Sequence, residues 1–156
     1  MKNLKIWSLA MILLMALVGC SKKGNNPGTT DPVGSFEGIE KEWKLVSVDG
    51  VGADFNVYIK FEMGSFAMYQ QIYTLEYKFF DGEYKINGST LSGSYFDGGE
   101  WKTSYTGGIT NEGNTLTLKS KEENPITCVY ETCTIPEQIK EEALNSTRST
   151  EVVPFL

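Results

Sequence analysis

The 156-residue sequence contains no histidine. This absence excludes Ser-His-Asp and Cys-His catalysis and any zinc site built from imidazole ligands. Cysteine is also scarce, because the chain has only three, and none has the spacing or the companions of a metal-binding motif. The sequence therefore points to neither a cofactor nor a bound metal.

Basic residues are few, and they do not cluster. The formal net charge is −6, from 14 basic and 20 acidic residues. Binding to nucleic acid depends on lysine and arginine side chains that meet phosphates, so we expect no nucleic-acid partner. Electrostatic attachment to anionic lipid is disfavoured for the same reason.

The acidic residues supply no recognisable catalytic or calcium motif. Glu76, Glu83 and Glu100 are the candidates for a carboxylate pair, but nothing in their positions brings two of them together. The stretch Asp97–Glu100 (DGGE) has too few ligands for a calcium loop and is typical of a tight hairpin. We therefore expect that the chain is not an enzyme.

The chain has one long apolar run, Ile6 to Val18, preceded by two lysines. At thirteen residues it is shorter than the roughly 20 that a membrane span needs, and it fits the central region of a secretory signal peptide. It leads into Leu17-Val18-Gly19-Cys20, which resembles the bacterial lipobox. An uncleaved anchor and an ordinary signal peptide with a chance cysteine are the alternatives.

The lipobox resemblance implies cleavage before Cys20 and acylation of this residue with fatty acids such as palmitate. Several acyl chains on one residue anchor stably, since each buried CH₂ contributes about 0.8 kcal/mol. We therefore predict a signal peptide over residues 1–19 and attachment to the lipid bilayer through Cys20. Removing the leader leaves 12 basic and 20 acidic residues, so the mature net charge is −8.

The two remaining cysteines, Cys128 and Cys133, are predicted to stay unpaired. They lie five residues apart in ITCVYETC, and an odd offset on one strand directs them to opposite faces. Their Cα atoms would be about 16 Å apart, far beyond the roughly 7 Å limit for a disulfide.

Residues 20–40 are predicted to form a flexible lipidated tether, because the stretch is polar and rich in Gly, Pro, Asn and Thr. The composition then changes abruptly, and residues 43–105 hold 15 of the 19 aromatic residues. A barrel domain is predicted over 41–135, followed by a C-terminal helix and tail over 136–156.

Alternating apolar residues predict half-buried strands separated by hairpin dipeptides such as Asp49-Gly50 and Asn87-Gly88. In NVYIKFEM, for example, Val57, Ile59 and Phe61 share one face. Strands are expected near 42–49, 55–63, 65–73, 74–80, 82–87, 89–96, 100–107, 114–120 and 125–133, with the fourth and fifth joined into one bent strand as an alternative. Short connections favour an all-β, antiparallel up-and-down meander barrel of about eight strands over a two-sheet sandwich.

One short helix is predicted in TIPEQIKEEALN. Thr134 and Glu137 have the spacing of a capping box, and Pro136 suits the first turn. Ile135, Ile139 and Ala143 form an apolar stripe for docking on a sheet.

Several blocks occur in an order that resembles the lipocalin-like lipoproteins of Bacteroidetes, over roughly Glu42 to Lys140. These blocks are EWKLVSVDG, FAMYQ, GEYKINGSTLSGSYFDGGEWKTSY, NTLTLK, VYE and IPEQIK, with a terminal FL. The positions that carry most of the resemblance are Gly82, Tyr84, Gly88, Leu91, Gly93, Tyr95, Asp97, Gly98 and Trp101. The resemblance implies a small lipid-anchored meander barrel in the bacterial cell envelope. No acidic pair follows Cys20, which favours the periplasmic face of the outer membrane over the cell surface.

Aromatic side chains are the remaining functional signal, although most of them will simply fill the barrel. Tyr69, Tyr77, Trp101 and Tyr105 are the candidate ligand-binding residues, because each neighbours a polar residue that could orient a ligand.

Three functions compete. The first is binding of a small hydrophobic or amphipathic ligand in or at the mouth of the barrel, which requires a cavity of about 300 Å³ or more. The second is a ligand-free structural lipoprotein that serves as accessory to an envelope protein complex and exposes an apolar patch. The third, an enzyme with coupled carboxylates, ranks last.

Overall fold

The computed structural model describes residues 34–146 and 152–156. The predicted signal peptide, the predicted lipidation site Cys20 and the tether as far as residue 33 lie outside these residues. The strands are β1 (Glu42–Val48), β2 (Val51–Gly52), β3 (Asn56–Glu62), β4 (Ser65–Gln71), β5 (Lys78–Asn87), β6 (Thr90–Tyr95), β7 (Tyr105–Thr110), β8 (Thr115–Ser120) and β9 (Thr127–Thr132). A 3₁₀ turn, η1 (Asn111–Gly113), follows β7, and one helix, α1 (Glu137–Asn145), follows β9.

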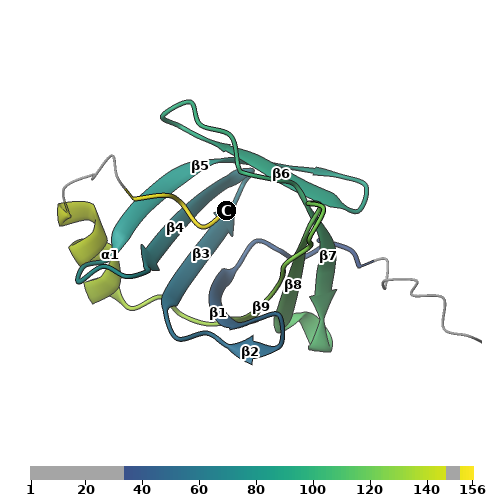
Figure 1. Ribbon diagram of the computed structural model, residues 1–156, viewed down its shortest axis with the longest axis horizontal. Helices are drawn as coiled ribbons and strands as arrows, with labels where there is room; N and C mark the ends of the chain where they lie inside the picture. The colour runs from purple at the N-terminus through teal and green to yellow at the C-terminus, as the bar shows by residue number, and fades with distance from the viewer. Residues whose placement is uncertain (1–33, 147–151) are drawn as a thin grey trace, which may run out of the picture.

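The sheet closes on itself as an eight-stranded barrel, shown in Figure 1. From β3 to β9 each strand pairs antiparallel with the next, β1 pairs with β3, and β1 also pairs with β9 from Trp43–Thr132 to Val48–Cys128. The short β2 is an extra strand that pairs with the last two residues of β1, Ser47 and Val48. The prediction of an up-and-down meander barrel is confirmed, and the sandwich alternative is wrong. Among the described residues, no helix has the length and apolar character needed to cross a membrane.

Three of the predicted strands differ from the observed ones. The fourth and fifth form one strand, β5, which begins only at Lys78, while residues 72–77 form a connection. The strand expected over 100–107 begins at Tyr105, because Trp101 turns inward and packs on Phe66. Before Tyr105, Glu100 forms an isolated bridge to Ser94.

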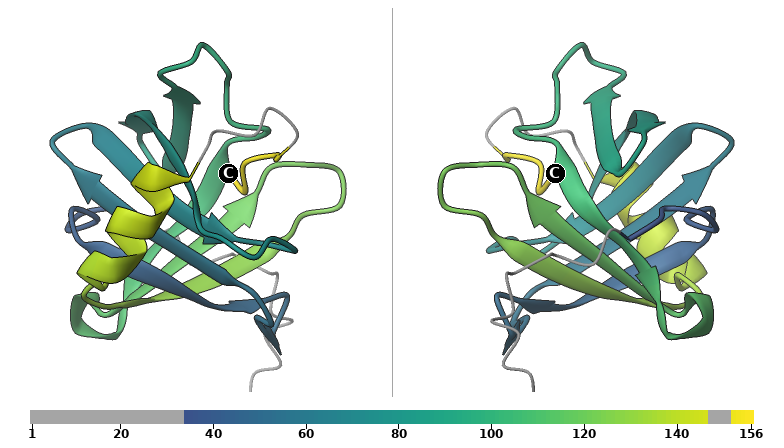
Figure 2. Two further views of the ribbon diagram at one scale, coloured as in Figure 1. Left: turned by 90° about the vertical axis from the view of Figure 1, so that its left-hand side faces the viewer. Right: turned by 90° about the vertical axis from the view of Figure 1, so that its right-hand side faces the viewer.

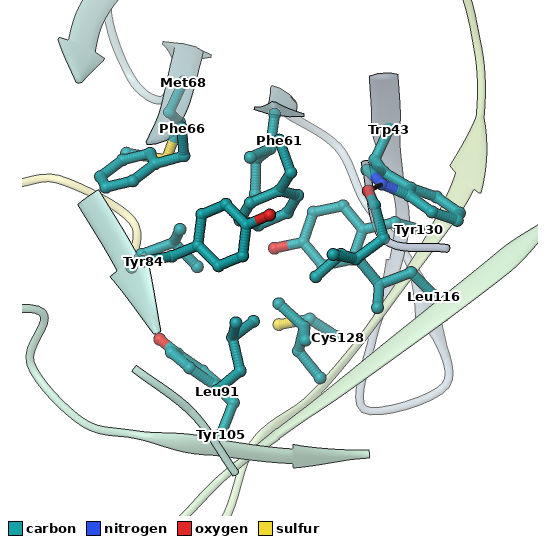
Figure 3. Packing of buried hydrophobic residues seen from close by; sticks show 14 of the residues in the cluster. Trp43, Phe61, Phe66, Met68, Tyr84, Leu91, Tyr105, Leu116, Cys128 and Tyr130 are labelled. Atoms are coloured by element: carbon teal, nitrogen blue, oxygen red, sulfur yellow. Dashed lines mark hydrogen bonds between the residues drawn. The ribbon is translucent and has the colours of Figure 1, made fainter. Parts of the chain in front are cut away.

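Side-chain alternation fills the barrel with apolar groups. Val57, Ile59 and Phe61 of β3 are almost fully buried in one cluster, together with side chains from the other barrel strands. Figure 3 shows side chains of this cluster meeting in the interior, including Phe61, Tyr84 and Tyr130 from three different strands. The apolar faces expected from the sequence therefore form the core.

The chain entering β1 seals one end of the barrel. Phe36 and Ile39 are each only 2% exposed and belong to the buried side chains. The Trp43 indole Nε1 donates to the Ile39 carbonyl over 2.8 Å, and the Ile109 amide donates to the Ser35 carbonyl over 2.9 Å. The packed domain thus begins before residue 41, and residues 34–40 of the predicted tether lie against the barrel.

Helix α1 lies on the outside of the barrel, across β4 and β5 (Figure 2). Ile135 and Ala143 are buried there, with Ile139 packed beside them, which confirms the apolar stripe. The capping box is wrong, because Pro136 takes the N-cap position and no side chain caps the helix. Instead, a Glu42 carboxylate oxygen accepts a 2.7 Å hydrogen bond from the Ile135 amide and fixes the entry to the helix.

Glycines in β5 and β6 let the chain pack closely where a side chain would not fit. A Cβ at Gly82 would clash with the Ser94 carbonyl oxygen. A Cβ at Gly93 would enter the Trp101 ring and approach the Glu83 carbonyl oxygen to 2.8 Å. Gly93 therefore provides the space that the buried indole occupies.

We expect the substitution Gly93→Ala to lower the free energy of unfolding by about 1–3 kcal/mol, since overpacking displaces the indole or the strand. Urea unfolding followed by tryptophan fluorescence measures this change. The matched control is Gly52→Ala, whose added Cβ has no neighbour within 4 Å and which should change stability by less than about 0.5 kcal/mol. Equal stability of the two variants would contradict the packing argument.

Candidate functional site

The end of the barrel opposite the sealed one is open, and we call it the mouth. Because the strands alternate in direction, the β1–β3, β4–β5, β6–β7 and β8–β9 connections all surround it. A cavity of about 430 Å³ lies there. Its lining residues are Val48, Phe55, Ile72, Tyr73, Lys102, Thr103, Tyr105, Ser120, Glu122, Ile126, Cys128, Val153, Pro154 and Phe155.

The cavity is mainly apolar, with a few polar groups. Phe55, Ile72 and Phe155 present apolar surface, while Lys102 and Glu122 bring one charge of each sign to the lining. Ligand pockets in proteins are commonly about 300–1,000 Å³ and have this composition. The arrangement suits a molecule that is mostly apolar and carries a polar group.

Residues Val152–Leu156, which we call the inserted segment, enter the mouth. Figure 1 shows this segment returning from the region of α1 to a position within the outline of the barrel. Leu156 is 1% exposed and belongs to the core cluster, and the Phe155 ring lies 5.8 Å from the Phe55 ring. The Tyr95 hydroxyl donates a 2.7 Å hydrogen bond to the Leu156 carbonyl oxygen.

Gln70 holds the main chain of the inserted segment. Its side chain is 1% exposed, on the inward face of β4 that also carries Phe66 and Met68. The amide Nε2 donates to the Val153 carbonyl oxygen over 3.0 Å, and Oε1 accepts from the Phe155 amide over 2.8 Å. Both polar ends of a buried amide are thus satisfied by main-chain groups of one short segment.

Buried hydroxyl and thiol groups lie close together in the interior. Desolvation, and then the charge of Asp49, raise the pKa of the Cys128 thiol to about 11. Desolvation likewise raises the pKa of Tyr105 and Tyr95 far above the usual value for tyrosine, and the neighbouring Cys128 adds to the effect at Tyr105. These groups therefore stay protonated at neutral pH and can donate hydrogen bonds.

Two buried polar atoms lack a hydrogen-bond partner within the described part of the chain, the Tyr130 hydroxyl and the Trp101 indole Nε1. The Tyr130 side chain has no exposed surface and points into the barrel, as Figure 3 shows. Burial raises its pKa well above the usual value, with contributions from Cys128, Tyr105 and Tyr95. An unsatisfied hydroxyl in this position is available to a polar group that enters the interior.

The structure separates the four predicted ligand-binding residues into two pairs. Trp101 and Tyr105 are buried in the core with ring centroids 5.9 Å apart, and Tyr105 also lines the mouth cavity. Tyr69 and Tyr77 lie outside the barrel with α1, in the cluster that contains Ile135. Tyr69 lies outside because side chains alternate between the two faces of a strand. The neighbouring Met68 faces the interior of the barrel, and Tyr69, which pairs with Phe79 of β5, faces outward.

Sequence reasoning missed Gln70 and the inserted segment. Gln70 had a usable signal, because the inward alternation Phe66, Met68 and Ile72 includes position 70. The terminal FL is part of the resemblance described above, but no local pattern predicts where a segment without secondary structure will lie.

The cysteines and carboxylates in the described part of the chain form no second chemical site. Cys128 is buried inside and Cys133 half-buried beneath α1, and both are free thiols, which confirms the prediction that they do not pair. Glu76 accepts a hydrogen bond from Ser146, whereas Glu83 pairs across from Ser94. Over residues 34–146 and 152–156, no three Cys, Asp or Glu side chains could hold a metal ion.

Exposed apolar side chains concentrate around the mouth. Tyr73 and Leu75 in the β4–β5 connection are 94% and 96% exposed. The other large exposed apolar residues on the connections at this end and on the inserted segment are Val51, Phe96, Ile126 and Val153. We call these six residues the apolar rim.

The raised pKa values make a prediction about stability at high pH. The unfolded chain loses the Cys128 proton near pH 9, whereas the folded chain keeps it until about pH 11. The free energy of unfolding should thus be unaffected below pH 9 and fall as the pH rises through this window, by up to about 1.4 kcal/mol per pH unit for each such group.

Urea unfolding at about pH 8 and about pH 10.5 measures this slope. The variant Cys128→Ala should show a smaller loss of stability between the two pH values. A slope that is the same in both proteins would contradict the assignment of Cys128.

The solved structures that are similar to this chain include the following three. A lipocalin-like protein from Bacteroides uniformis is 16% identical, with a TM-score of 0.48 over 62% of this chain and 99% of that one. An uncharacterized protein from Bacteroides eggerthii is 17% identical, with a TM-score of 0.46 over 60% and 98%. A REP1-NXSQ fatty acid transporter is 12% identical, with a TM-score of 0.39 over 63% and 98%.

No protein-family model and no curated protein sequence matches the chain. The pairing of its strands makes the described domain a closed eight-stranded antiparallel up-and-down barrel, which is the fold that the resemblance found in the sequence implies.

Proposed function

We propose that this chain is a membrane-anchored lipoprotein that binds a small hydrophobic or amphipathic molecule at the mouth of its barrel. The observation that carries the proposal is the cavity of about 430 Å³, which remains open beside the inserted segment. Among the described residues, buried side chains fill the interior below the mouth, so the mouth is where the interior offers a ligand room. The role is binding, without a chemical step.

The lining supports a ligand with both apolar and polar parts. Each Å² of apolar surface that a ligand buries against Phe55, Ile72 or Tyr105 contributes about 25 cal/mol. The protonated hydroxyl of Tyr105 and the charged groups Lys102 and Glu122 can orient the polar part. The apolar rim favours contact between the mouth and an apolar molecule before it enters.

The anchor in this proposal is Cys20, acylated after removal of residues 1–19. The lipobox-like ending Leu17–Cys20 supports it, as does the basic and apolar leader that precedes this ending. The stretch CSKKGNN has no acidic pair, which supports attachment to the periplasmic face of the outer membrane. A lipid-anchored barrel with an apolar mouth would work close to a source of amphipathic molecules.

Filling the cavity should remove binding. We expect Ile72→Trp to weaken binding of the apolar dye N-phenyl-1-naphthylamine at least about tenfold, because Ile72 lines the cavity and the larger ring occupies it. Dye fluorescence measured against protein concentration gives the affinity. The matched control Ile86→Trp, at a position of β5 that is 44% exposed and outside the cavity lining, should bind as the unchanged chain does. A chain that binds no dye, or an Ile72→Trp variant that binds it fully, contradicts the proposal.

The anchor is tested by Cys20→Ala. We expect this variant to lose incorporation of labelled palmitate and to leave the detergent-soluble membrane fraction, since its acyl chains are gone. Cys128→Ala is the control and should keep both properties. Protease added to intact cells should leave the unchanged chain uncut, and cleavage there would overturn the periplasmic assignment.

A second function is an accessory to an envelope protein complex, and the apolar rim is the observation that favours it. Six exposed apolar side chains around one end of a barrel could pack against a partner protein. A native mass spectrum of the chain purified from its own membrane distinguishes the two functions. Retained small-molecule mass supports ligand binding, and a co-purifying protein supports the accessory role.

A further inference from the structure

The inserted segment is held as a ligand is held, by specific polar contacts and by apolar side chains that enter the barrel. Gln70 offers a donor to the Val153 carbonyl oxygen and an acceptor to the Phe155 amide. Tyr95 offers a second donor, to the Leu156 carbonyl oxygen. Three hydrogen bonds thus bind main-chain atoms of the five-residue inserted segment, and none of them involves a side chain of that segment.

Gln70 would be difficult to explain as a packing residue. An amide buried to 1% exposure on an apolar face is unfavourable unless both its ends are paired. Both of the hydrogen bonds that its side chain makes go to the inserted segment. The side chain therefore specifies an occupant that presents a carbonyl and an amide two residues apart in an extended chain.

The apolar contacts add a sequence preference to this main-chain recognition. Pro154 lies between the two groups that Gln70 binds, and it has no amide hydrogen that would need a partner of its own. Proline also favours an extended conformation of the residue before it, here Val153. The Phe155 ring then packs against the Phe55 ring in a tilted arrangement, and Leu156 enters the core.

From these contacts we infer that the mouth is a peptide-binding site for an extended apolar peptide of the type apolar–Pro–aromatic–aliphatic, and that Val152–Leu156 is its resident occupant. The inference rests on the proposed binding function of the mouth and names the class of its ligand. A free peptide of this type competes with the resident segment. The segment's attachment to the chain gives it a local concentration of about millimolar, which a free competitor must overcome.

The test weakens the binding of the inserted segment by substitution and then measures the binding of the same sequence added as a free peptide. The full chain carrying Phe155→Ser and Leu156→Ser loses both apolar anchors of the segment. The probe is a dye-labelled peptide of sequence VVPFL, and fluorescence anisotropy measures its affinity. We expect the released variant to bind the probe at least about tenfold more tightly than the unchanged chain, because its own segment no longer competes. Equal affinities, or binding by neither protein, overturn the inference.

Gln70 provides the specificity control. In the released variant, Gln70→Glu removes the donor to the peptide carbonyl while keeping the shape of the side chain, and we expect at least about a tenfold loss of affinity for VVPFL. The neighbouring Gln71→Glu should leave the affinity unchanged, since Gln71 bonds to Leu75 in the β4–β5 connection. A shuffled peptide of the same composition should bind at least about tenfold more weakly. No effect of Gln70→Glu overturns the inference.

Leu156 is part of the core, so the released variant could lose its fold. In that case added VVPFL should restore its near-ultraviolet circular dichroism and raise its Tm, because a ligand that binds only the folded state stabilises it. A variant that is neither folded nor rescued shows that the segment is core structure alone and overturns the inference.

The apolar dye separates this result from the proposed function. A released variant that binds N-phenyl-1-naphthylamine but not VVPFL overturns the peptide site and leaves ligand binding in place. A variant that binds neither overturns both proposals. Binding of VVPFL without the dye supports the peptide site and removes the small-molecule form of the proposed function.

Discussion

Pairing between β1 and β9 is the constraint on which the rest of the structure depends. These are the first and last strands of the ring, and their paired residues run from Trp43 opposite Thr132 to Val48 opposite Cys128. Without this pairing both strands would be open edges, exposed to association with other chains. With it, one face of every strand turns inward, and whatever lies on that face must pack, bind a partner group or line a cavity.

The two ends of the closed barrel are completed in different ways. At one end Phe36 and Ile39 precede β1 in the chain and pack directly into the core. At the other, the occupying residues come from the far end of the sequence, and they leave a cavity of about 430 Å³ beside them. Their hold depends on Gln70, whose amide would cost about 1–3 kcal/mol if it were left buried and unpaired. A polar group on an inward face thus makes this end selective for main-chain groups.

The outer face shows why aromatic composition alone is a weak guide to function. Tyr69 and Tyr77 are as buried as Tyr105, yet they lie beneath α1 with Ile135 and Ala143. Tyr105 and Tyr95 point inward, where burial raises the pKa of each hydroxyl and keeps it a hydrogen-bond donor. Residues of one type therefore divide between docking a helix and lining the interior, according to their position in the alternation.

The sequence by itself determined the class of fold, most of the strands and the apolar stripe of the helix, because period-two alternation, hairpin dipeptides and helical spacing are local properties. It also determined that Cys128 and Cys133 do not pair, since five residues of strand hold them apart. Only the tertiary structure decided which tyrosines face inward together, that Phe36 and Ile39 belong to the core, and that Val152–Leu156 occupies the mouth. These features depend on contacts between residues far apart in the chain, such as Gln70 with Phe155, and no local pattern encodes such contacts.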